Sequence, residues 1–128
     1  MDEEAALLRA IAGQPEEDAP RLALADWLDE RGKPGDGAWA ELIRVQVALA
    51  LGPGADRDRL TARERELVPG VSAGWPGRFG LPLGLAWQNW TRGFPVTLSG
   101  RGELIRAAYP AFAGRVALRE FNVRAASD

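Results

Sequence analysis

The chain has 128 residues, of which 46% are hydrophobic and five are tryptophan, and its formal net charge is -2. This is enough for one domain with a substantial core, without a general basic field for nucleic acid or an anionic membrane. It has no cysteine and no histidine, which excludes disulfides, thiol nucleophiles, zinc–thiolate sites and histidine-based catalysis. The acidic N-terminus is unlike a secretory signal and no apolar run is long enough to cross a bilayer, so we expect a cytoplasmic protein.

The N-terminal half shows two amphipathic helical patterns before its first long turn. Asp2 predicts the N-cap of a first helix, which Gly13 ends. Asp18 predicts the N-cap of a second helix, because its carboxylate can accept from the free N–H groups of a first turn. Arg31 suits the C-terminal dipole of that helix, and Gly32 can supply a left-handed last residue.

Two further helices are expected before the helical patterns give way to a segment rich in glycine and proline. Asp36 predicts the cap of a third helix over residues 37–51. The Thr61–Glu64 spacing fits a capping box, and the helix that it opens is expected to be short because Pro69–Gly70 follows. Residues 70–84 are rich in glycine and proline with embedded aromatics, which predicts an ordered loop fixed on a core.

The C-terminal part shows strand patterns. Residues 85–90 and 94–98 predict two strands that flank a turn at Arg92–Gly93. Trp87 and Trp90 have odd spacing and cannot share one face of a regular strand, so either a bulge intervenes or one of them lies at the turn.

A helix and a last strand complete the expected order. Ser99 and Gly100 are expected to open a short helix that Pro110 ends or kinks. Val116 and Leu118 alternate as a last strand that could extend to Val123, parallel to the strand before the helix.

These patterns predict a single α+β domain over 1–128. A helical bundle of three to four helices over 1–68 is expected to pack on a small sheet with one crossover helix over 85–124. One strand–helix–strand unit leaves an open sheet edge.

Several strings resemble a known family. Pro20–Leu22 (PRL) and Ala25–Gly32 (ADWLDERG), then Ala40–Gln46 (AELIRVQ), resemble the signature of the bacterial, planctomycete-type repeat-companion domain family. Trp90–Phe94 (WTRGF), followed by Val96–Leu98, resembles a later strand of that family. The likeness covers nearly the whole chain in order, and ADWLDERG is its most specific part.

The resemblance implies a module that stands N-terminal to leucine-rich or other repeats, with no general catalytic activity. This sequence departs from that pattern around residues 68–80, which look shortened, and it stops where repeats would begin. We therefore expect a free-standing module that meets its partner in trans, or a fragment of a longer repeat protein. The structural signature residues that the resemblance marks are Asp26, Trp27, Arg31, Gly32, Glu41, Arg44 and Gln46.

Two polar positions on the helices allow alternatives. Asp26 and Glu30 share a helix face and could hold a divalent ion, or Asp26 could pair with Arg21 or Arg44 and tie the second helix to the third. Gln46 falls on the buried stripe of the third helix and is expected to bond the backbone of the loop over residues 33–36.

The tryptophans divide into two groups. Trp27 and Trp39 are expected in the core, and the later aromatics are expected to be more open. Because tryptophan is enriched at binding hot spots, we expect the partner contact at the later group. These predicted partner-binding residues are Trp75, Trp87, Trp90, Arg92 and Phe94.

The function that fits best is a non-catalytic protein–protein interaction module, an adaptor or accessory subunit that needs no cofactor or metal. Its expected contact is the edge and outer face of the C-terminal sheet. An alternative is a nucleic-acid-contacting subunit of a larger bacterial ribonucleoprotein or defence complex, through the arginines over residues 57–65 and Arg92. A third is a carboxylate-dependent metal enzyme at Asp26 and Glu30. The glycines do not form a nucleotide-binding loop.

Overall fold

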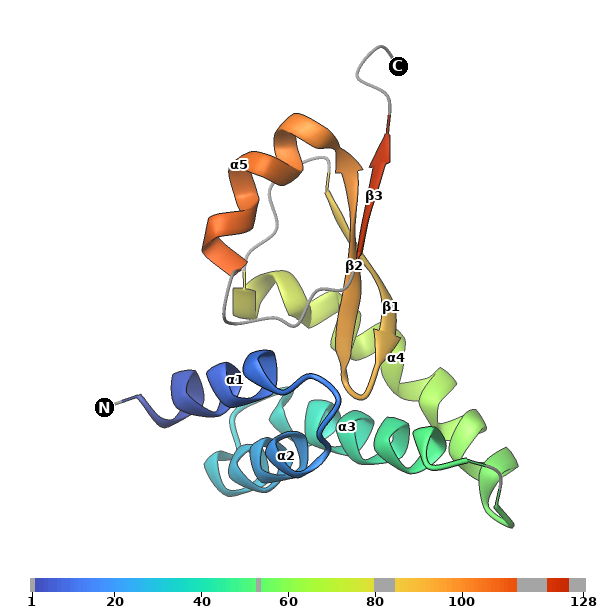
Figure 1. The fold of residues 1–128 in the computed structure, drawn as a ribbon. Helices are drawn as coiled ribbons and strands as arrows, with labels where there is room; N and C mark the ends of the chain where they lie inside the picture. The colour runs from blue at the N-terminus through green and yellow to red at the C-terminus, as the bar shows by residue number, and fades with distance from the viewer. Residues whose placement is uncertain (1, 53, 80–84, 113–119, 125–128) are drawn as a thin grey trace.

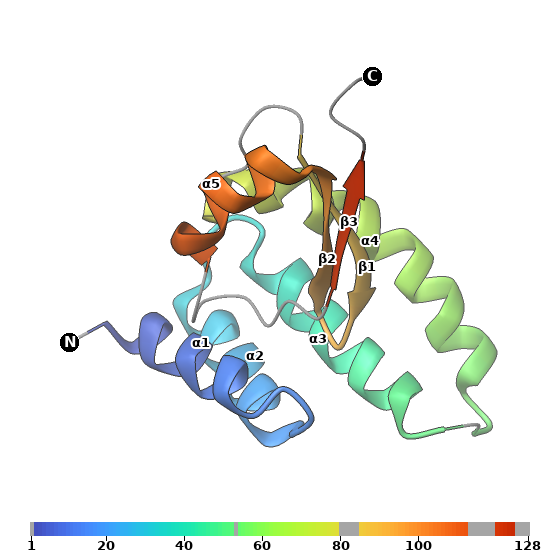
Figure 2. The same cartoon turned by 45° about the horizontal axis from the view of Figure 1, so that its top comes forward.

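The computed structural model describes residues 2–52, 54–79, 85–112 and 120–124. It confirms the α+β class, with N-terminal helices beneath a small sheet and a helix beside that sheet (Figure 1; Figure 2). Within the described ranges the elements are α1 (Glu3–Gly13), α2 (Ala19–Arg31), α3 (Asp36–Ala50), α4 (Arg57–Phe79), β1 (Ala86–Thr91), β2 (Phe94–Arg101), α5 (Gly102–Phe112) and β3 (Glu120–Arg124).

The ends of the first helices follow local signals in part. The Asp2 carboxylate accepts from the Ala5 N–H at 3.3 Å and caps α1, as predicted. Gly32 ends α2 in the left-handed conformation and donates to the Leu28 carbonyl, also as predicted. The predicted capping by Asp18 is wrong, because its side chain makes no cap bond to α2 and lies beside Arg92 instead.

The start of α3 also differs from the prediction. Gly35, in the left-handed conformation, precedes the helix, and Asp36 is its first residue rather than its cap. The Asp36 carboxylate faces back to the α2–α3 turn, where it accepts from the Lys33 N–H at 3.0 Å. A carboxylate in the first turn still complements the helix dipole.

The predicted short fourth helix is wrong, and so is the predicted loop over residues 70–79. Residues 80–84 of that predicted loop lie outside the described residues. α4 continues for 23 residues to Phe79, across Pro69–Gly70, so the helical part extends well beyond residue 68 and Thr61 lies inside the helix. The reason is a buried stripe of Leu67, Val71 and Trp75, one turn apart. Burial of three large side chains offsets the roughly 3 kcal/mol that an interior proline costs.

The sheet has the order β1-β2-β3, antiparallel between β1 and β2 and parallel between β2 and β3. The predicted turn at Arg92–Gly93 is confirmed, and both residues have positive φ angles (50° and 87°), as a two-residue hairpin requires. The parallel pairing predicted for the last strand is confirmed for β3. Val116 and Leu118 lie outside the described residues.

The predicted helix start at Ser99 and Gly100 is wrong. β2 continues through both residues, because they pair with Asn122 and Val123 of β3. α5 begins at Gly102 and contains Pro110 within its last turn.

Trp87 and Trp90 lie on one side of β1. The reason is neither a bulge nor a tryptophan at the turn, the two alternatives that the sequence suggested. The pairing register with β2 is the same before and after Asn89, so no residue is inserted. Asn89 instead has a φ of 60°, which turns the strand between the two tryptophans. Both rings contact Trp75 as a result.

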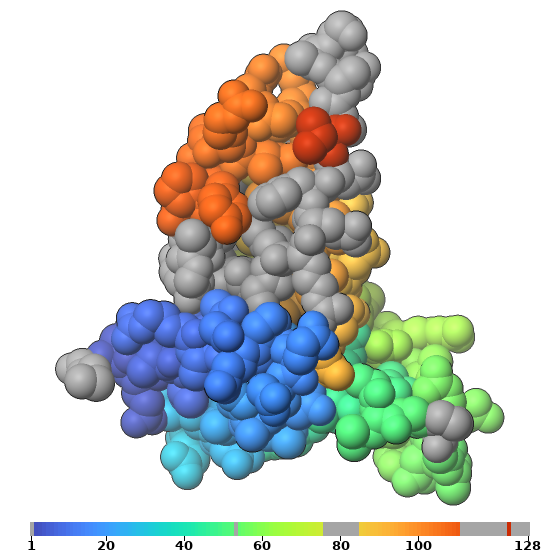
Figure 3. All heavy atoms as spheres, viewed as in Figure 1, coloured from blue at the N-terminus to red at the C-terminus, as the bar shows by residue number. Residues whose placement is uncertain are grey.

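One continuous cluster of buried side chains joins the helices to the sheet and includes Trp39, Trp75 and Phe94. In the space-filling view the N-terminal helices form the lower layer, with α5 and the coloured part of β3 above (Figure 3). Across the described ranges, no helix has the length and apolarity that a bilayer crossing requires.

Candidate functional site

The tip of the β1–β2 hairpin is held on α3 by the backbone of Gly93. Its N–H donates to Gln46 Oε1 at 2.7 Å, and its carbonyl accepts from Trp39 Nε1 at 2.8 Å. A Cβ at this position would overlap the Ile43 side chain and lie 2.9 Å from the Ile43 Cα. Both the left-handed φ and the close approach therefore require glycine.

Gln46 connects three elements. Its Nε2 donates to Glu64 Oε2 of α4 at 2.8 Å and to the Trp90 carbonyl of β1 at 3.2 Å. The prediction that Gln46 is buried is confirmed, but the predicted partner in the 33–36 loop is wrong. The position of an amide on an apolar stripe indicated that Gln46 is buried and needs a hydrogen-bond partner. Nothing near Gln46 in the sequence indicated that this partner is Gly93, 47 residues away.

Trp75 is the centre of an aromatic cluster. Four rings contact it edge-on, with centroid distances of 5.2 Å to Trp39, 6.3 Å to Trp87, 5.0 Å to Trp90 and 5.9 Å to Phe94. Such T-shaped pairs add to the stabilisation that burial alone gives.

The burial of this cluster corrects the predicted partner-binding set. Trp75, Trp87 and Phe94 are buried in the chain's own core, so they offer no contact surface. Trp90 is partly exposed and Arg92 is mostly covered.

Arg92 links the hairpin turn to the loop between α1 and α2. Its guanidinium lies 2.9 Å from the Asp18 carboxylate, as an ion pair without hydrogen-bond geometry, and 3.7 Å from Glu16. Arg21 is buried beneath this loop, donates to the Pro15 carbonyl at 3.0 Å and lies over the Phe94 ring. The arginine of the PRL string thus has a structural contact that sequence reasoning missed.

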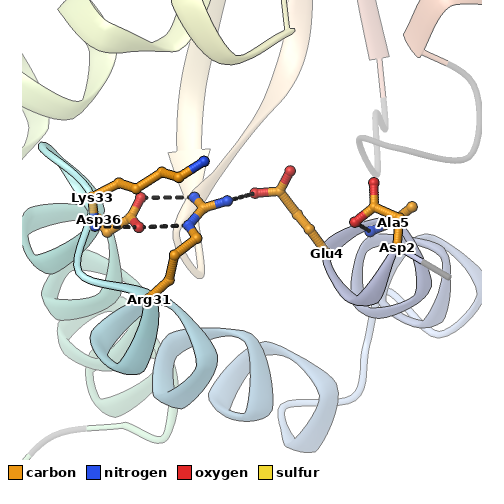
Figure 4. Close-up of polar contacts among 6 residues, drawn as sticks. All are labelled: Asp2, Glu4, Ala5, Arg31, Lys33 and Asp36. Carbon is orange, nitrogen blue, oxygen red and sulfur yellow. Dashed lines mark hydrogen bonds and ion pairs between the residues drawn. The ribbon is translucent and has the colours of Figure 1, made fainter.

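At the end of the ADWLDERG string, Arg31 forms a network of hydrogen bonds and ion pairs at the α2–α3 turn (Figure 4). Arg31 donates to both Asp36 oxygens at 2.8 and 2.9 Å and lies 3.1 Å from the Glu4 carboxylate of α1. The hydrogen bond that Arg31 donates to Asp36 raises the pKa of Arg31, and the Asp36 side chain is only 1% exposed. This arrangement joins three helices.

Arg44 ties α3 to α2, as one of the sequence alternatives predicted. It donates to Asp26 at 2.8 Å and to Asp29 at 2.6 Å, and these bonds raise its pKa. Trp39 is buried as predicted, whereas Trp27 is half-buried with the Arg31 guanidinium 4.5 Å from its ring centroid.

Two of the four arginines over residues 57–65, Arg59 and Arg63, are paired with acids. Arg63 donates to both Glu41 oxygens, from Nε at 2.5 Å and from Nη2 at 2.7 Å, and to Glu66 at 2.9 Å. These bonds raise the pKa of Arg63 and lower that of Glu41. Arg59 pairs with Asp56. A phosphate track needs cations free to replace counterions, and Arg59 and Arg63 on this surface are already paired with acids.

β1 and β3 are the two edge strands of the sheet in the described part of the chain. β2 has a neighbour on each side, and within the described part of the chain β3 has a strand neighbour on one side, β2. Val123 on β3 is 60% exposed.

Within the described ranges, no cluster of three or more Asp or Glu residues could hold a metal ion. Asp26, one of the two residues of the metal hypothesis, bonds Arg44, and Glu30 is exposed.

Comparisons with protein-family models, curated proteins and solved structures found no match to this chain. The resemblance to the repeat-companion family therefore stays a prediction from the residues.

Proposed function

We propose that this chain is a non-catalytic protein–protein interaction module, an adaptor or accessory subunit that docks on another protein through the edge of β3. The observation that carries the proposal is the sheet order, which leaves β3 at an edge with an exposed apolar residue, Val123. An edge strand presents backbone donors and acceptors that an added strand can pair.

The rest of the molecule holds the sheet, and with it the β3 edge, in a fixed position. Gly93, Gln46 and the aromatic cluster fasten the sheet to α3 and α4, so the edge is presented on a rigid base. A preformed edge loses less conformational entropy on binding than a flexible segment would.

The test is affinity capture with the purified chain, followed by mass photometry of the recovered complex. Val123→Lys places a charge on the edge, which discourages strand addition. Leu51→Lys is the matched control, because Leu51 is 79% exposed at the end of α3.

We expect the wild type and Leu51→Lys to recover the same partner, and Val123→Lys to lose it with an unchanged melting temperature. A wild-type chain that stays monomeric and captures nothing contradicts the proposal. Equal capture by both variants moves the contact away from the edge and also contradicts it.

A further inference from the structure

A second surface lies between α1 and α2, where a groove of about 480 Å³ opens to solvent. This volume falls in the range of ordinary ligand sites. Its apolar lining is Ala6 and Leu7 from α1 with Ala23 and Trp27 from α2. Leu7 and Trp27 are only half-buried, so the groove leaves part of each large side chain unpacked.

Carboxylates form the rest of the groove lining, with Glu3 from α1 and Asp26 and Glu30 from α2. Glu3 and Glu30 are exposed and make no ion pair within the described ranges, and Asp26 shares Arg44 with Asp29. Among the residues that the structure describes, no lysine or arginine lines the groove.

The charge around the groove has the same sign. Residues 1–50 contain eleven acidic and five basic residues, a net charge of -6. Arg31, the cation beside Trp27, is engaged by Asp36 and Glu4. The field at the groove therefore favours a cationic partner.

We propose that the α1–α2 groove binds a basic amphipathic helix of a partner protein. Ala6 and Ala23 allow a third helix to approach closely, Leu7 and Trp27 meet its apolar stripe, and the carboxylates meet its lysines or arginines. This is the helix-in-groove mode of peptide recognition. The proposal goes beyond the edge contact and does not depend on it, because α1 and α2 lie below the sheet whereas β3 extends away from them (Figure 1).

The probe is a fluorescein-labelled peptide of leucine and lysine, roughly 18 residues or five helical turns, with leucines at the spacing of one helix face. A leucine–glutamate peptide of the same pattern and a scrambled leucine–lysine peptide are its controls. Fluorescence anisotropy measures binding, and the shift of the Trp27 indole N–H in a proton–nitrogen NMR spectrum locates it.

The decisive variant is the double substitution Glu3→Lys with Glu30→Lys. Its matched control is Glu17→Lys with Asp58→Lys, which changes the net charge equally at two exposed acids outside the groove. Neither control residue has an ion pair within the described ranges. Ala23→Gln fills the groove without changing the charge.

We expect saturable binding of the leucine–lysine peptide, weakened by at least tenfold in the Glu3/Glu30 variant and in Ala23→Gln and nearly unchanged in the control. The affinity should fall between about 50 and 500 mM salt. Equal weakening in both double variants would show general charge attraction and overturn the proposal. Equal binding of the scrambled or the leucine–glutamate peptide would also overturn the proposal. Displacement of the leucine–lysine peptide by tetramethylammonium ions alone would overturn it as well, and so would a Trp27 signal that does not shift. Loss of edge docking in Val123→Lys leaves this result unaffected, so the two proposals fail separately.

Discussion

The two faces of α3 carry polar contacts of opposite character. Towards the hairpin, Trp39 and Gln46 make buried hydrogen bonds to the backbone of Gly93. Towards α2, Arg44 makes solvent-exposed ion pairs with Asp26 and Asp29. Buried groups are costly to leave without a partner, whereas exposed ion pairs compete with water and salt. We therefore expect the polar contacts of the hairpin face to stabilise the fold strongly and the Arg44 ion pairs on the α2 face to contribute little.

The largest effect is expected from Gly93→Ala. The new Cβ would overlap Ile43, and a left-handed φ strains any other residue, so we expect a loss of roughly 3–5 kcal/mol in urea unfolding. Gly70→Ala in α4 is the control, because a Cβ there meets nothing within 4 Å and alanine favours a helix. It should be neutral or slightly stabilising. A Gly93→Ala chain as stable as the wild type would contradict the claim that the contacts on the hairpin face of α3 stabilise the fold strongly.

Asp36→Asn tests an intermediate case, a buried carboxylate with a partly exposed arginine. The change leaves Arg31 with the Glu4 carboxylate as its acidic neighbour in Figure 4, and the Arg31 side chain is 21% exposed. We expect a loss of about 2–3 kcal/mol in thermal or urea unfolding, below the value for a fully buried pair. A loss under half of this would mean that solvent already screens the pair.

Gln46→Met removes the polar head of a buried side chain at nearly constant volume. The Gly93 N–H would lose its acceptor, and the expected cost is roughly 1–3 kcal/mol in the free energy of unfolding. Gln46→Glu should cost more, because it places a second carboxylate beside Glu64. Stability equal to the wild type in both variants would show that Gly93 finds another acceptor.

Asp26→Ala probes the α2 face. Because the Asp26 side chain is exposed and Arg44 keeps Asp29, we expect a change under about 1 kcal/mol, smaller still at high salt. A cost equal to that of Gln46→Met would contradict the predicted difference between the two faces.

The smallest effect concerns pH. The Arg63 hydrogen bonds lower the pKa of Glu41 from its ordinary value of 4.5. A lowered folded-state pKa gives stability that is present above about pH 4.5 and is lost as the pH falls through the folded value. The stability difference between the wild type and Glu41→Gln should therefore shrink in acid. A difference that grows below pH 4.5 would contradict this sign.

Local signals predicted the local parts of this fold. Asp2, Gly32 and the Arg92–Gly93 turn act within a few residues, and the sequence predicted all three. α4 was missed because Pro69–Gly70 is a strong local stop, while the deciding Leu67–Val71–Trp75 stripe gains its energy from tertiary burial.

The candidate sites divide in the same way. The Asp26–Arg44 pair was predictable from two neighbouring helices, whereas the Gln46–Gly93 bond joins residues 47 positions apart. The shared side of Trp87 and Trp90 depends on the left-handed Asn89. The odd spacing of the two tryptophans indicated an irregular strand, but not which residue causes it.

Native-state hydrogen exchange at the Gly93 amide tests most directly whether the hairpin and α3 form one cooperative unit. If the buried bond to Gln46 fastens the hairpin tip, this amide should exchange only through global unfolding, with the same free energy as the slowest amides of α3. Exchange at a much lower free energy than α3 would show that the hairpin opens by itself, and would contradict the account.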